Sequence, residues 1–374
     1  MTNDGIGDRR SEERRRPRVH LVHGPTPIVR RPALDDLVGA EVWIKRDDAT
    51  AGPESGNKLR KLEFLVADAM DRGARAIVTC GGLQSNHARA TALVCAQMGL
   101  RSVLLLRVPD PAKAREEPLP LSGNVLLDKL AGAEIRFVSP DEYRERSGML
   151  EQARVDTEDK GLPTYIVPEG GSNGLGSLGY VEAMREVRRQ IDLGLAGPSR
   201  GEGDASIPHF DVVAHACGSG GTAAGVALGA ARFGVAREAW AFPVCDDNAY
   251  FKKVIARIAL EARSHEPSLP EIAFLEPGTG HAVAPDGAAR MIVDDRAKGP
   301  AYAVMSEEQK RFLVRVARTT GMLFDPVYTG KALWGLAEAV ANGDIRMGSR
   351  VLFLHTGGLP GLLAQGEELR SALG

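Results

Sequence analysis

Cysteine is scarce in this sequence, with 4 residues in a chain of 374. The four stand singly at Cys80, Cys95, Cys217 and Cys245, with no CxxC pair and no spacing typical of a zinc finger. This pattern excludes a disulfide-based scaffold and predicts no metal site. Single cysteines are typical of small buried side chains, and their scarcity favours a cytoplasmic protein.

Long apolar runs and an excess of charge of one sign are also absent. No apolar segment is long enough to span a membrane, and the formal net charge is −2. A nearly balanced charge gives no reason to expect nucleic acid or an anionic membrane as a partner. Residues 1–18 carry charges but no apolar stretch, so we expect a solvated tail and not a secretory leader.

What the sequence does contain is a regular alternation of strand-like and helical segments. Apolar, strand-like runs at 74–80, 102–108, 133–139 and 211–217 alternate with amphipathic helical patterns. This rhythm is typical of parallel sheets covered by helices on both faces. A chain of 374 residues is also long enough for two domains. The sequence therefore predicts a two-domain α/β protein.

The segment GNKLRKLEF, residues 56–64, places Lys58 at the predicted start of a helix, with apolar residues following at helical spacing. A cation is unfavourable at the positive end of the helix dipole. Arg60 and Lys61 add more positive charge there. Lys58 is therefore either a tolerated surface residue or an amine that loses its proton easily.

A second segment, ACGSGGTAAG at 216–225, follows an apolar strand and opens a helix. Unobstructed backbone N–H groups at a helix start bind anions, and Thr222 adds a hydroxyl, so we predict a phosphate site. Two alternatives stay open. The glycines also suit tight strand–helix packing, and Gly218-x-Gly220 with the later Asp246 also fits the dinucleotide site of an NAD-dependent oxidoreductase.

Polar groups follow other predicted strands as well. GGLQSNHARA at 81–90 has four consecutive polar side chains at a helix start, which suits a substrate carboxylate, although one of them could be only a helix cap. YTGK at 328–331 and HTGG at 355–358 are weaker patterns. All three lie where parallel strands end, the edge at which open α/β sheets bind ligands. This favours an enzyme over a non-catalytic binding module.

In sequence order, IKRDD, GNKLRKLEF, GLQSNHARATA, GSGGTAAG, LFDPVYTGKA and HTGG resemble the D-cysteine desulfhydrase and 1-aminocyclopropane-1-carboxylate deaminase family. These are pyridoxal 5′-phosphate enzymes of fold type II, similar to the tryptophan synthase β subunit. The resemblance implies open, twisted, mostly parallel sheets and a homodimer. It also implies a large cofactor-binding domain from 19–58 and 168–374, with a small α/β domain, 59–167, inserted in it.

The resemblance assigns roles to the matching positions. It implies that Lys58 binds the cofactor covalently, that Asn86 contacts the ring hydroxyl and that Thr356 faces the ring nitrogen. The phosphate cradle it implies is Gly218, Ser219, Gly220, Gly221 and Thr222. The catalytic residues it implies are Lys58, Ser85, Tyr302 and Tyr328. Substrate contacts are implied for Gln84, Ser85, Asn86, His87, Tyr302 and Tyr328.

The activity that the resemblance implies is α,β-elimination, with D-cysteine giving pyruvate, sulfide and ammonia. Thr329 and Thr356 stand where ring-opening deaminases of the family resemble YEGK and HLGG, which favours the desulfhydrase. A β-replacement synthase, a lyase for cysteate or chloroalanine, and the deaminase stay open as alternatives. Glu169, Asp246 and Asp247 bear on the substrate, because their segments depart from the family pattern.

Overall fold

The structure is a computed structural model and describes residues 17–116, 121–198, 208–278 and 285–374. Most of the predicted tail, residues 1–18, therefore lies outside the described residues. Its final residue, Arg18, lies 3.5 Å from the carboxylate of Glu63. All four cysteines are free, and three of them are buried, in agreement with the prediction.

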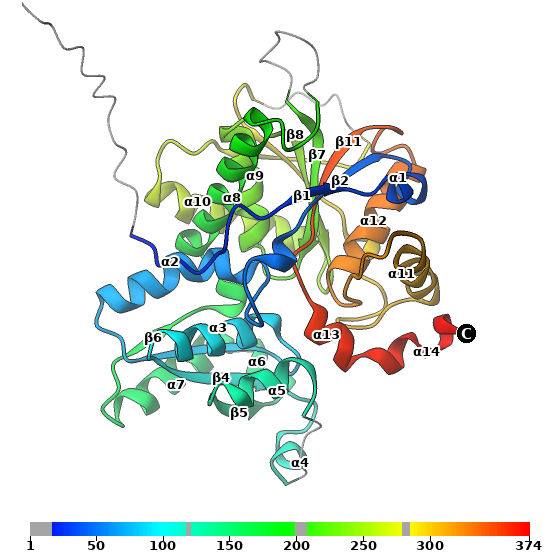
Figure 1. The fold of residues 1–374 in the computed structure, drawn as a ribbon. Helices are drawn as coiled ribbons and strands as arrows, with labels where there is room; N and C mark the ends of the chain where they lie inside the picture. Colours follow the sequence, from blue (N-terminus) through cyan, green and yellow to red (C-terminus); the bar gives the residue numbers. More distant parts are fainter. Residues whose placement is uncertain (1–16, 117–120, 199–207, 279–284) are drawn as a thin grey trace, which may run out of the picture.

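The larger of two sheets has seven strands in the order β1-β2-β11-β7-β8-β10-β9 (Figure 1). Among the described strands of this sheet, β1 and β2 are the antiparallel pair, and the other neighbours are parallel. The strands are β1 (Ile28–Arg30), β2 (Glu41–Lys45), β7 (Phe210–Cys217), β8 (Ala236–Pro243), β9 (Ile272–Leu275), β10 (Ala289–Val293) and β11 (Arg350–Leu354).

The smaller sheet has four parallel strands in the order β5-β4-β3-β6. They are β3 (Ala76–Gly82), β4 (Arg101–Arg107), β5 (Glu134–Val138) and β6 (Thr164–Ile166). All four come from one stretch of chain, whereas the strands of the larger sheet come from before and after it. The chain thus leaves the larger sheet after β2 and returns to it at β7.

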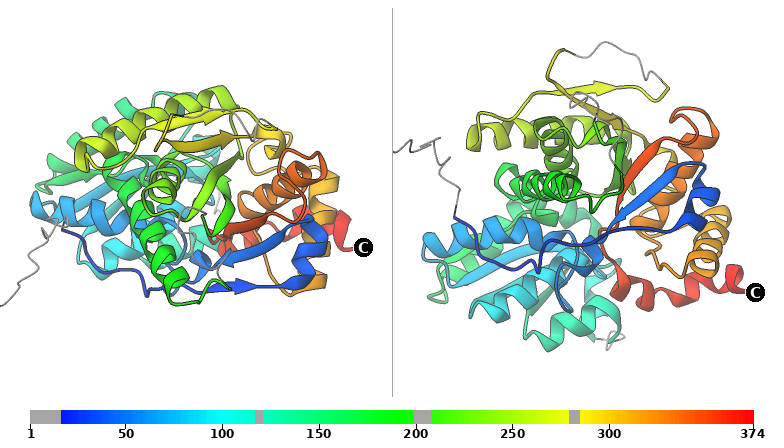
Figure 2. Two further views of the ribbon diagram at one scale, coloured as in Figure 1. Left: turned by 90° about the horizontal axis from the view of Figure 1, so that it is seen from above. Right: turned by 45° about the horizontal axis from the view of Figure 1, so that its top comes forward.

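Helices cover both faces of each sheet (Figures 1 and 2). In the larger sheet one apolar core joins the strands to α8, α9 and α10, and another joins them to α1, α11 and α12. The helices are α1 (Pro32–Val38), α2 (Lys58–Asp71), α3 (Asn86–Gln97), α4 (Pro111–Glu116), α5 (Gly123–Leu130), α6 (Pro140–Arg144), α7 (Arg146–Glu158), α8 (Gly174–Asp192), α9 (Gly221–Arg232), α10 (Asn248–His265), α11 (Glu307–Thr320), α12 (Thr329–Ala341), α13 (Leu359–Ala364) and α14 (Arg370–Leu373). The predicted α/β class, with mostly parallel sheets and helices on both faces, is confirmed.

Helix α8 begins at Gly174 and contains three glycines in its first two turns. Asn173 caps it by accepting a hydrogen bond from the N–H of Gly176 at 2.8 Å. Glycine disfavours helix by propensity, but here it permits close packing. A Cβ on Gly179 would lie 2.0 Å from the carbonyl oxygen of Arg60, so the glycine lets α8 approach α2.

Arg60 belongs to a buried ionic cluster and does not add free charge beside Lys58, contrary to the expectation from sequence. Its guanidinium donates to both carboxylate oxygens of Asp47, at 2.7 and 2.8 Å, and to Glu186 at 3.0 Å. Asp47 also accepts hydrogen bonds from Thr26 at 2.8 Å and Tyr180 at 2.7 Å. These bonds tie the start of the chain and α2 to α8. The cluster therefore fixes the helix that carries Lys58.

No helix among the described residues is long and apolar enough to cross a membrane. The same part of the chain contains no group of three or more His, Cys, Asp or Glu side chains able to hold a metal ion.

Candidate active site

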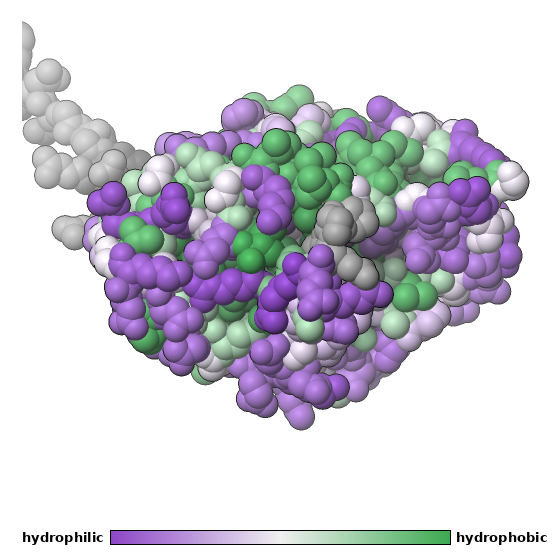
Figure 3. Space-filling view, turned by 90° about the horizontal axis from the view of Figure 1, so that it is seen from below, coloured by the Kyte–Doolittle hydropathy of each residue, from purple (hydrophilic) through white to green (hydrophobic). Residues whose placement is uncertain are grey.

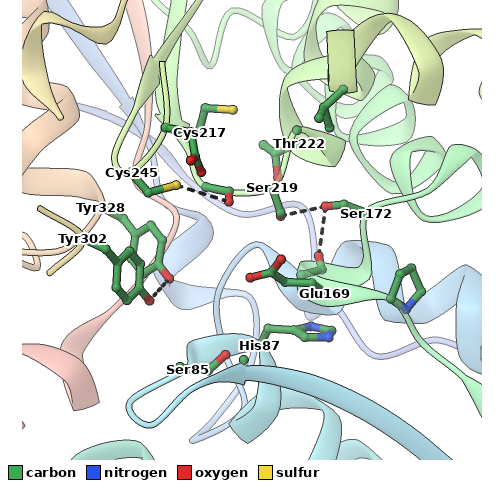
Figure 4. Close-up of a pocket in the computed structure, with 18 of the residues that line it drawn as sticks. Ser85, His87, Glu169, Ser172, Cys217, Ser219, Thr222, Cys245, Tyr302 and Tyr328 are labelled. Carbon is green, nitrogen blue, oxygen red and sulfur yellow. Dashed lines mark hydrogen bonds between the residues drawn. The ribbon is translucent and has the colours of Figure 1, made fainter. Parts of the chain in front are cut away.

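A cavity of about 890 Å³ is lined by residues at the carboxyl ends of strands from both sheets. This is the edge at which parallel α/β sheets bind ligands, and the volume suits a small molecule together with a cofactor. Figure 4 shows the polar side chains that point into it from several elements. The structure thus brings together most of the residues singled out in the sequence.

Lys58 is the first residue of α2 and lines this cavity. Its amine donates a hydrogen bond of 2.8 Å to Asn57 Oδ1, and Asn57 Nδ2 donates to Thr222 Oγ1 at 3.1 Å. Asn57 thereby links the amine to the glycine loop. Burial, followed by the positive charge of Arg89, lowers the pKa of Lys58 from 10.5 to about 8. The lowered pKa increases the share of neutral, nucleophilic amine at neutral pH.

This pKa predicts how the amine reacts with an aldehyde. Because the neutral amine is the nucleophile, the rate of pyridoxal phosphate attachment to cofactor-free protein should rise with pH and level off above about pH 8. A surface lysine would show a rise that continues toward pH 10.5. Stopped-flow absorbance at a series of pH values measures this. Arg89→Met removes a nearby positive charge, so it should move the midpoint to higher pH; a midpoint above pH 10 in the wild type would contradict the prediction.

The glycine loop forms a narrow cradle between β7 and α9. Gly220 has φ +83°, a conformation that favours glycine, and a Cβ on Gly221 would lie 2.7 Å from Ser172 Oγ and 3.0 Å from Lys61 Nζ. Gly221 N–H donates to Ser172 Oγ at 3.2 Å, and that hydroxyl lies 2.8 Å from Ser219 Oγ. Backbone donors and hydroxyls therefore converge where the sequence predicts a phosphate, beside the N-terminus of α9.

Lys61 lies behind this cradle, a position that its sequence context does not reveal. Its side chain is 1% exposed, and its amine donates to Gly170 O at 3.0 Å and to Ser172 Oγ at 3.1 Å. Burial and the charge of Lys58 lower the pKa of Lys61. An anion in the cradle would favour its charged form. The only sequence pattern that could have indicated this is the spacing of Lys58 and Lys61, which places both on one face of α2.

Ser85 is the helix cap that the sequence analysis allowed for among the four polar residues. Its Oγ accepts a hydrogen bond from the N–H of Ala88 at 3.2 Å, and it lines the cavity. The hydroxyl proton remains available as a donor. Asn86, also in the cavity wall, has its Oδ1 fixed by Asn124 Nδ2 at 3.1 Å. That contact leaves the amide N–H groups of Asn86 to face a ligand.

The structure does not bring Gln84 to the cavity wall. Its Oε1 accepts from the N–H of Asn124 at 2.8 Å, and its Nε2 donates to Ser122 O at 3.2 Å. The side chain therefore secures the start of α5. It serves the fold at this position, a role that depends on residues about 40 positions away and is invisible in the local sequence.

His87 lines the cavity but is buried and neutral. Thr79 donates its hydroxyl to Val167 O at 2.7 Å, so it accepts the proton of His87 Nε2, which lies 2.8 Å away. Burial, with Lys58 nearby, lowers the pKa of His87 well below its usual value. Nδ1 has no hydrogen-bond partner within the described residues. This ring lacks the charge that would attract a carboxylate, and its free nitrogen is itself buried.

Tyr302 and Tyr328 form one unit, as Figure 4 shows, with 2.7 Å between their hydroxyl oxygens. Burial raises the pKa of Tyr302 to about 12 and also raises the pKa of Tyr328 well above its usual value, so both remain protonated donors. Asp325, buried and unremarked in the sequence, accepts from the N–H of Tyr328 at 2.8 Å and from that of Thr329 at 2.8 Å. It holds the loop that carries Tyr328.

The two threonines of YTGK and HTGG have different environments. Thr356 lines the cavity, and its carbonyl accepts from Asn57 N–H at 3.1 Å. Thr329 is fully buried, with its hydroxyl donating to Asp325 Oδ1 at 2.6 Å. Of the two positions that differ from the deaminase patterns YEGK and HLGG, only Thr356 therefore lies where it can contact a ligand.

Comparison with known protein families matches residues 19–357 to the family described as "Pyridoxal-phosphate dependent enzyme". The chain belongs to this family. The match decides between the two cofactors that the glycine loop allowed, in favour of pyridoxal phosphate. It also agrees with the resemblance read from the motifs.

Several relatives of this pyridoxal-phosphate dependent enzyme are similar along most of their length. A mitochondrial bifunctional D-cysteine desulfhydrase/1-aminocyclopropane-1-carboxylate deaminase of Arabidopsis thaliana is 38% identical over 95% of this chain and 81% of its own. A D-cysteine desulfhydrase of Klebsiella pneumoniae is 35% identical over 93% of this chain and 96% of its own. A crystal structure of an ACC deaminase homologue shares 31% identity with a TM-score of 0.76, and covers 96% of each chain. The predicted family and fold type are confirmed.

The residues present fit pyridoxal phosphate. The cradle at 218–222 needs glycine, because Gly220 has φ +83° and a Cβ on Gly221 would collide with Ser172, and the buried amine of Lys61 is the opposite charge behind it. Lys58 supplies a reactive amine in the same cavity, and Thr356 and Asn86 supply further polar groups to its wall. One cavity therefore holds the residues that fit the cofactor together with residues that the sequence predicts to contact a substrate.

Proposed function

We propose that the enzyme eliminates the β-substituent of a small amino acid, with D-cysteine as the first candidate, to give pyruvate, sulfide and ammonia. The observation that carries the proposal is the meeting of Lys58, the glycine cradle and the α3 N-terminus in one cavity. Pyridoxal phosphate, when bound, supplies the electron sink that stabilises negative charge at the substrate Cα.

The remaining steps follow from residues of this chain. The Ser85 hydroxyl and the positive end of the α3 dipole bind the substrate carboxylate. The amine of Lys58, neutral to an unusual degree because of its lowered pKa, takes the proton from Cα; Ser85 is the alternative base. The paired hydroxyls of Tyr302 and Tyr328 donate a proton to the departing sulfide. Water then converts the released enamine to pyruvate and ammonia.

Thr356 favours elimination over ring opening. Its hydroxyl is neutral, so it cannot stabilise a protonated cofactor ring as an acidic side chain would. A less protonated ring withdraws fewer electrons, which suits a substrate whose β-substituent leaves promptly. Thr329 does not bear on the choice between elimination and ring opening, because its hydroxyl donates to Asp325.

The test is a substrate panel with the holoenzyme. We expect pyruvate and sulfide from D-cysteine, and kcat/KM at least about 10-fold lower for 1-aminocyclopropane-1-carboxylate, because ring opening gains less from a weak electron sink. L-cysteine tests stereospecificity, and β-chloroalanine tests the choice of leaving group. Cysteine supplied with a second thiol tests for β-replacement. Release of 2-oxobutyrate from the cyclopropane substrate at the higher rate would reverse the assignment.

We further propose two domains, 19–58 with 168–374 and 59–167, and a cytoplasmic homodimer. The separate origin of the two sheets supports the boundaries. Helices α5 and α13 pack against each other. Both carry exposed leucines, which support an interface between two copies of the chain: Leu126, Leu130, Leu359, Leu363. Figure 3 shows apolar patches among hydrophilic residues on the face seen from below. Light scattering in solution measures the assembly.

A further inference from the structure

Arg107, the last residue of β4, is a cavity residue that the sequence analysis did not identify. Parallel pairing places it beside Gly82 of β3, three residues before Ser85. Its guanidinium therefore enters the cavity from the strand next to the loop that carries Ser85. Arg107 is half-buried, so its charge is partly removed from solvent.

The guanidinium is held by two aromatic rings. It lies 5.0 Å from the ring centre of Tyr143 and 5.5 Å from that of Tyr302. Cation–π contact fixes the position of the charge. Such contact uses the flat faces of the guanidinium and leaves the N–H groups at its edge free to bind an oxyanion in a fork. Tyr143 is fixed in turn, because its hydroxyl donates to Glu169 at 2.6 Å.

Arg107 differs from the other arginines of the cavity in having no carboxylate partner within the part of the chain that the structure describes. The others form the pairs Arg144–Asp141, Arg146–Glu169 and Arg257–Glu261. Of the carboxylates in the cavity wall, Glu169 is taken by Arg146 and Tyr143, and Asp246 is exposed at the protein surface. The charge of Arg107 is therefore available to a ligand.

The cavity thus has three places for an anion, and the proposed function uses two of them. The glycine cradle takes the cofactor phosphate, and the α3 N-terminus with Ser85 takes the substrate carboxylate. Arg107 is the third. It contacts Tyr302, whose hydroxyl is paired with Tyr328 on the side assigned to the leaving group. A substrate that uses all three places carries a negative charge on its β-substituent.

Resting on the proposed elimination, we propose that Arg107 binds the β-substituent and extends the activity to alanines whose β-substituent is a sulfur oxyanion, sulfinate or sulfonate. For the sulfonate, cysteate, the Cα–H bond breaks and its proton passes to the Lys58 amine. The Cβ–S bond breaks, and sulfur leaves with the bonding electrons as sulfite. Water then replaces nitrogen at Cα, which gives pyruvate and ammonium. The reaction needs no oxidant or reductant.

The activity test compares cysteate and cysteine sulfinate with cysteine and β-chloroalanine, as both enantiomers, in the holoenzyme. We expect sulfite from cysteate, and we expect Arg107→Met to lower kcat/KM for the oxyanion substrates by about 100-fold, the usual scale for removing one member of a desolvated charge pair. The uncharged substrates should change less than about 5-fold. Arg107→Lys, which keeps charge but loses the fork, should fall between. Arg144→Met, an exposed cavity arginine, is the matched control and should leave all four substrates unchanged.

A binding test separates this inference from the proposed function. 3-Sulfopropanoate carries the carboxylate and sulfonate of cysteate but no amine, so it binds without reacting; butanoate lacks the sulfonate. Calorimetry should show tighter binding of 3-sulfopropanoate to the wild type, and Arg107→Met should abolish that preference. Failure of every β-substituted alanine to react would overturn the proposed elimination alone. Equal losses on all substrates in Arg107→Met, or no preference for the sulfonate ligand, would overturn the role of Arg107.

Discussion

Lys58→Ala should abolish turnover and covalent cofactor attachment together. Loss of proton transfer alone lowers a rate by about 10²–10⁴-fold, and loss of the covalent attachment adds to this. The visible absorption of the lysine-bound cofactor should disappear, although the cradle, which does not include Lys58, should still bind pyridoxal phosphate reversibly. Absorbance, dialysis and a pyruvate assay measure the three properties.

Two variants control this experiment. Lys58→Arg keeps a positive charge at the start of α2 but cannot attack an aldehyde, so it should be as inactive as Lys58→Ala. Lys129→Ala, an exposed lysine at the end of α5, should behave as wild type. Retention of covalent cofactor and normal turnover by Lys58→Ala would refute the assignment of this lysine.

Asp47→Ala should cause the largest loss of stability. Removing one partner of a buried ion pair costs about 3–5 kcal/mol, because the remaining charge stays buried without compensation. Here the residue left behind is Arg60, with 5% side-chain exposure, which loses its more deeply buried carboxylate and keeps only Glu186. The bonds that Asp47 accepts from Thr26 and Tyr180 are lost as well. Urea unfolding followed by circular dichroism gives the free energy of unfolding. Asp36→Ala, an exposed carboxylate on α1, is the matched control and should change it by less than about 0.5 kcal/mol.

The same carboxylate predicts a pH dependence. Burial opposes ionisation of Asp47, but the charge and hydrogen bonds of Arg60 outweigh it and lower its pKa from 3.8 to about 2. A carboxyl with a lowered pKa stabilises the fold fully above its ordinary pKa, and that stabilisation is lost as pH falls toward the lowered value. The difference in stability between wild type and Asp47→Ala should therefore shrink between about pH 4 and pH 2. A constant difference over that range would contradict the ionic role.

Local sequence was sufficient wherever a role depends on neighbouring residues. Lys58 at the start of α2, the glycine cradle before α9 and the cap at Ser85 each follow from a strand end, a few residues and a helical pattern. The alternation of such segments also predicted the class of fold. The backbone at these places is determined by sequence within one turn of helix.

The failures involve contacts between distant segments. Arg60 resembled a second free charge, but its partners Asp47 and Glu186 lie 13 and 126 positions away. Gln84 was predicted to contact the substrate, but its side chain accepts a hydrogen bond from the backbone at the start of α5. Arg107 resembled the ordinary polar end of a strand, since only the folded chain brings the rings of Tyr143 and Tyr302 beside it. A sequence shows which side chains are charged or can form hydrogen bonds, but it does not show which distant residues they pair with.

The site also affects how the two halves of the molecule come apart. Lys58 begins the helix by which the chain passes from the larger sheet to the smaller, while the cradle belongs to the larger sheet and Ser85 to the smaller. A bound cofactor and substrate would therefore contact residues of both sheets at once and hold the two sheets together. Binding stabilises only those conformations in which the halves are together. Loss of the cofactor should thus favour opening along this seam, where proteases would first reach the chain.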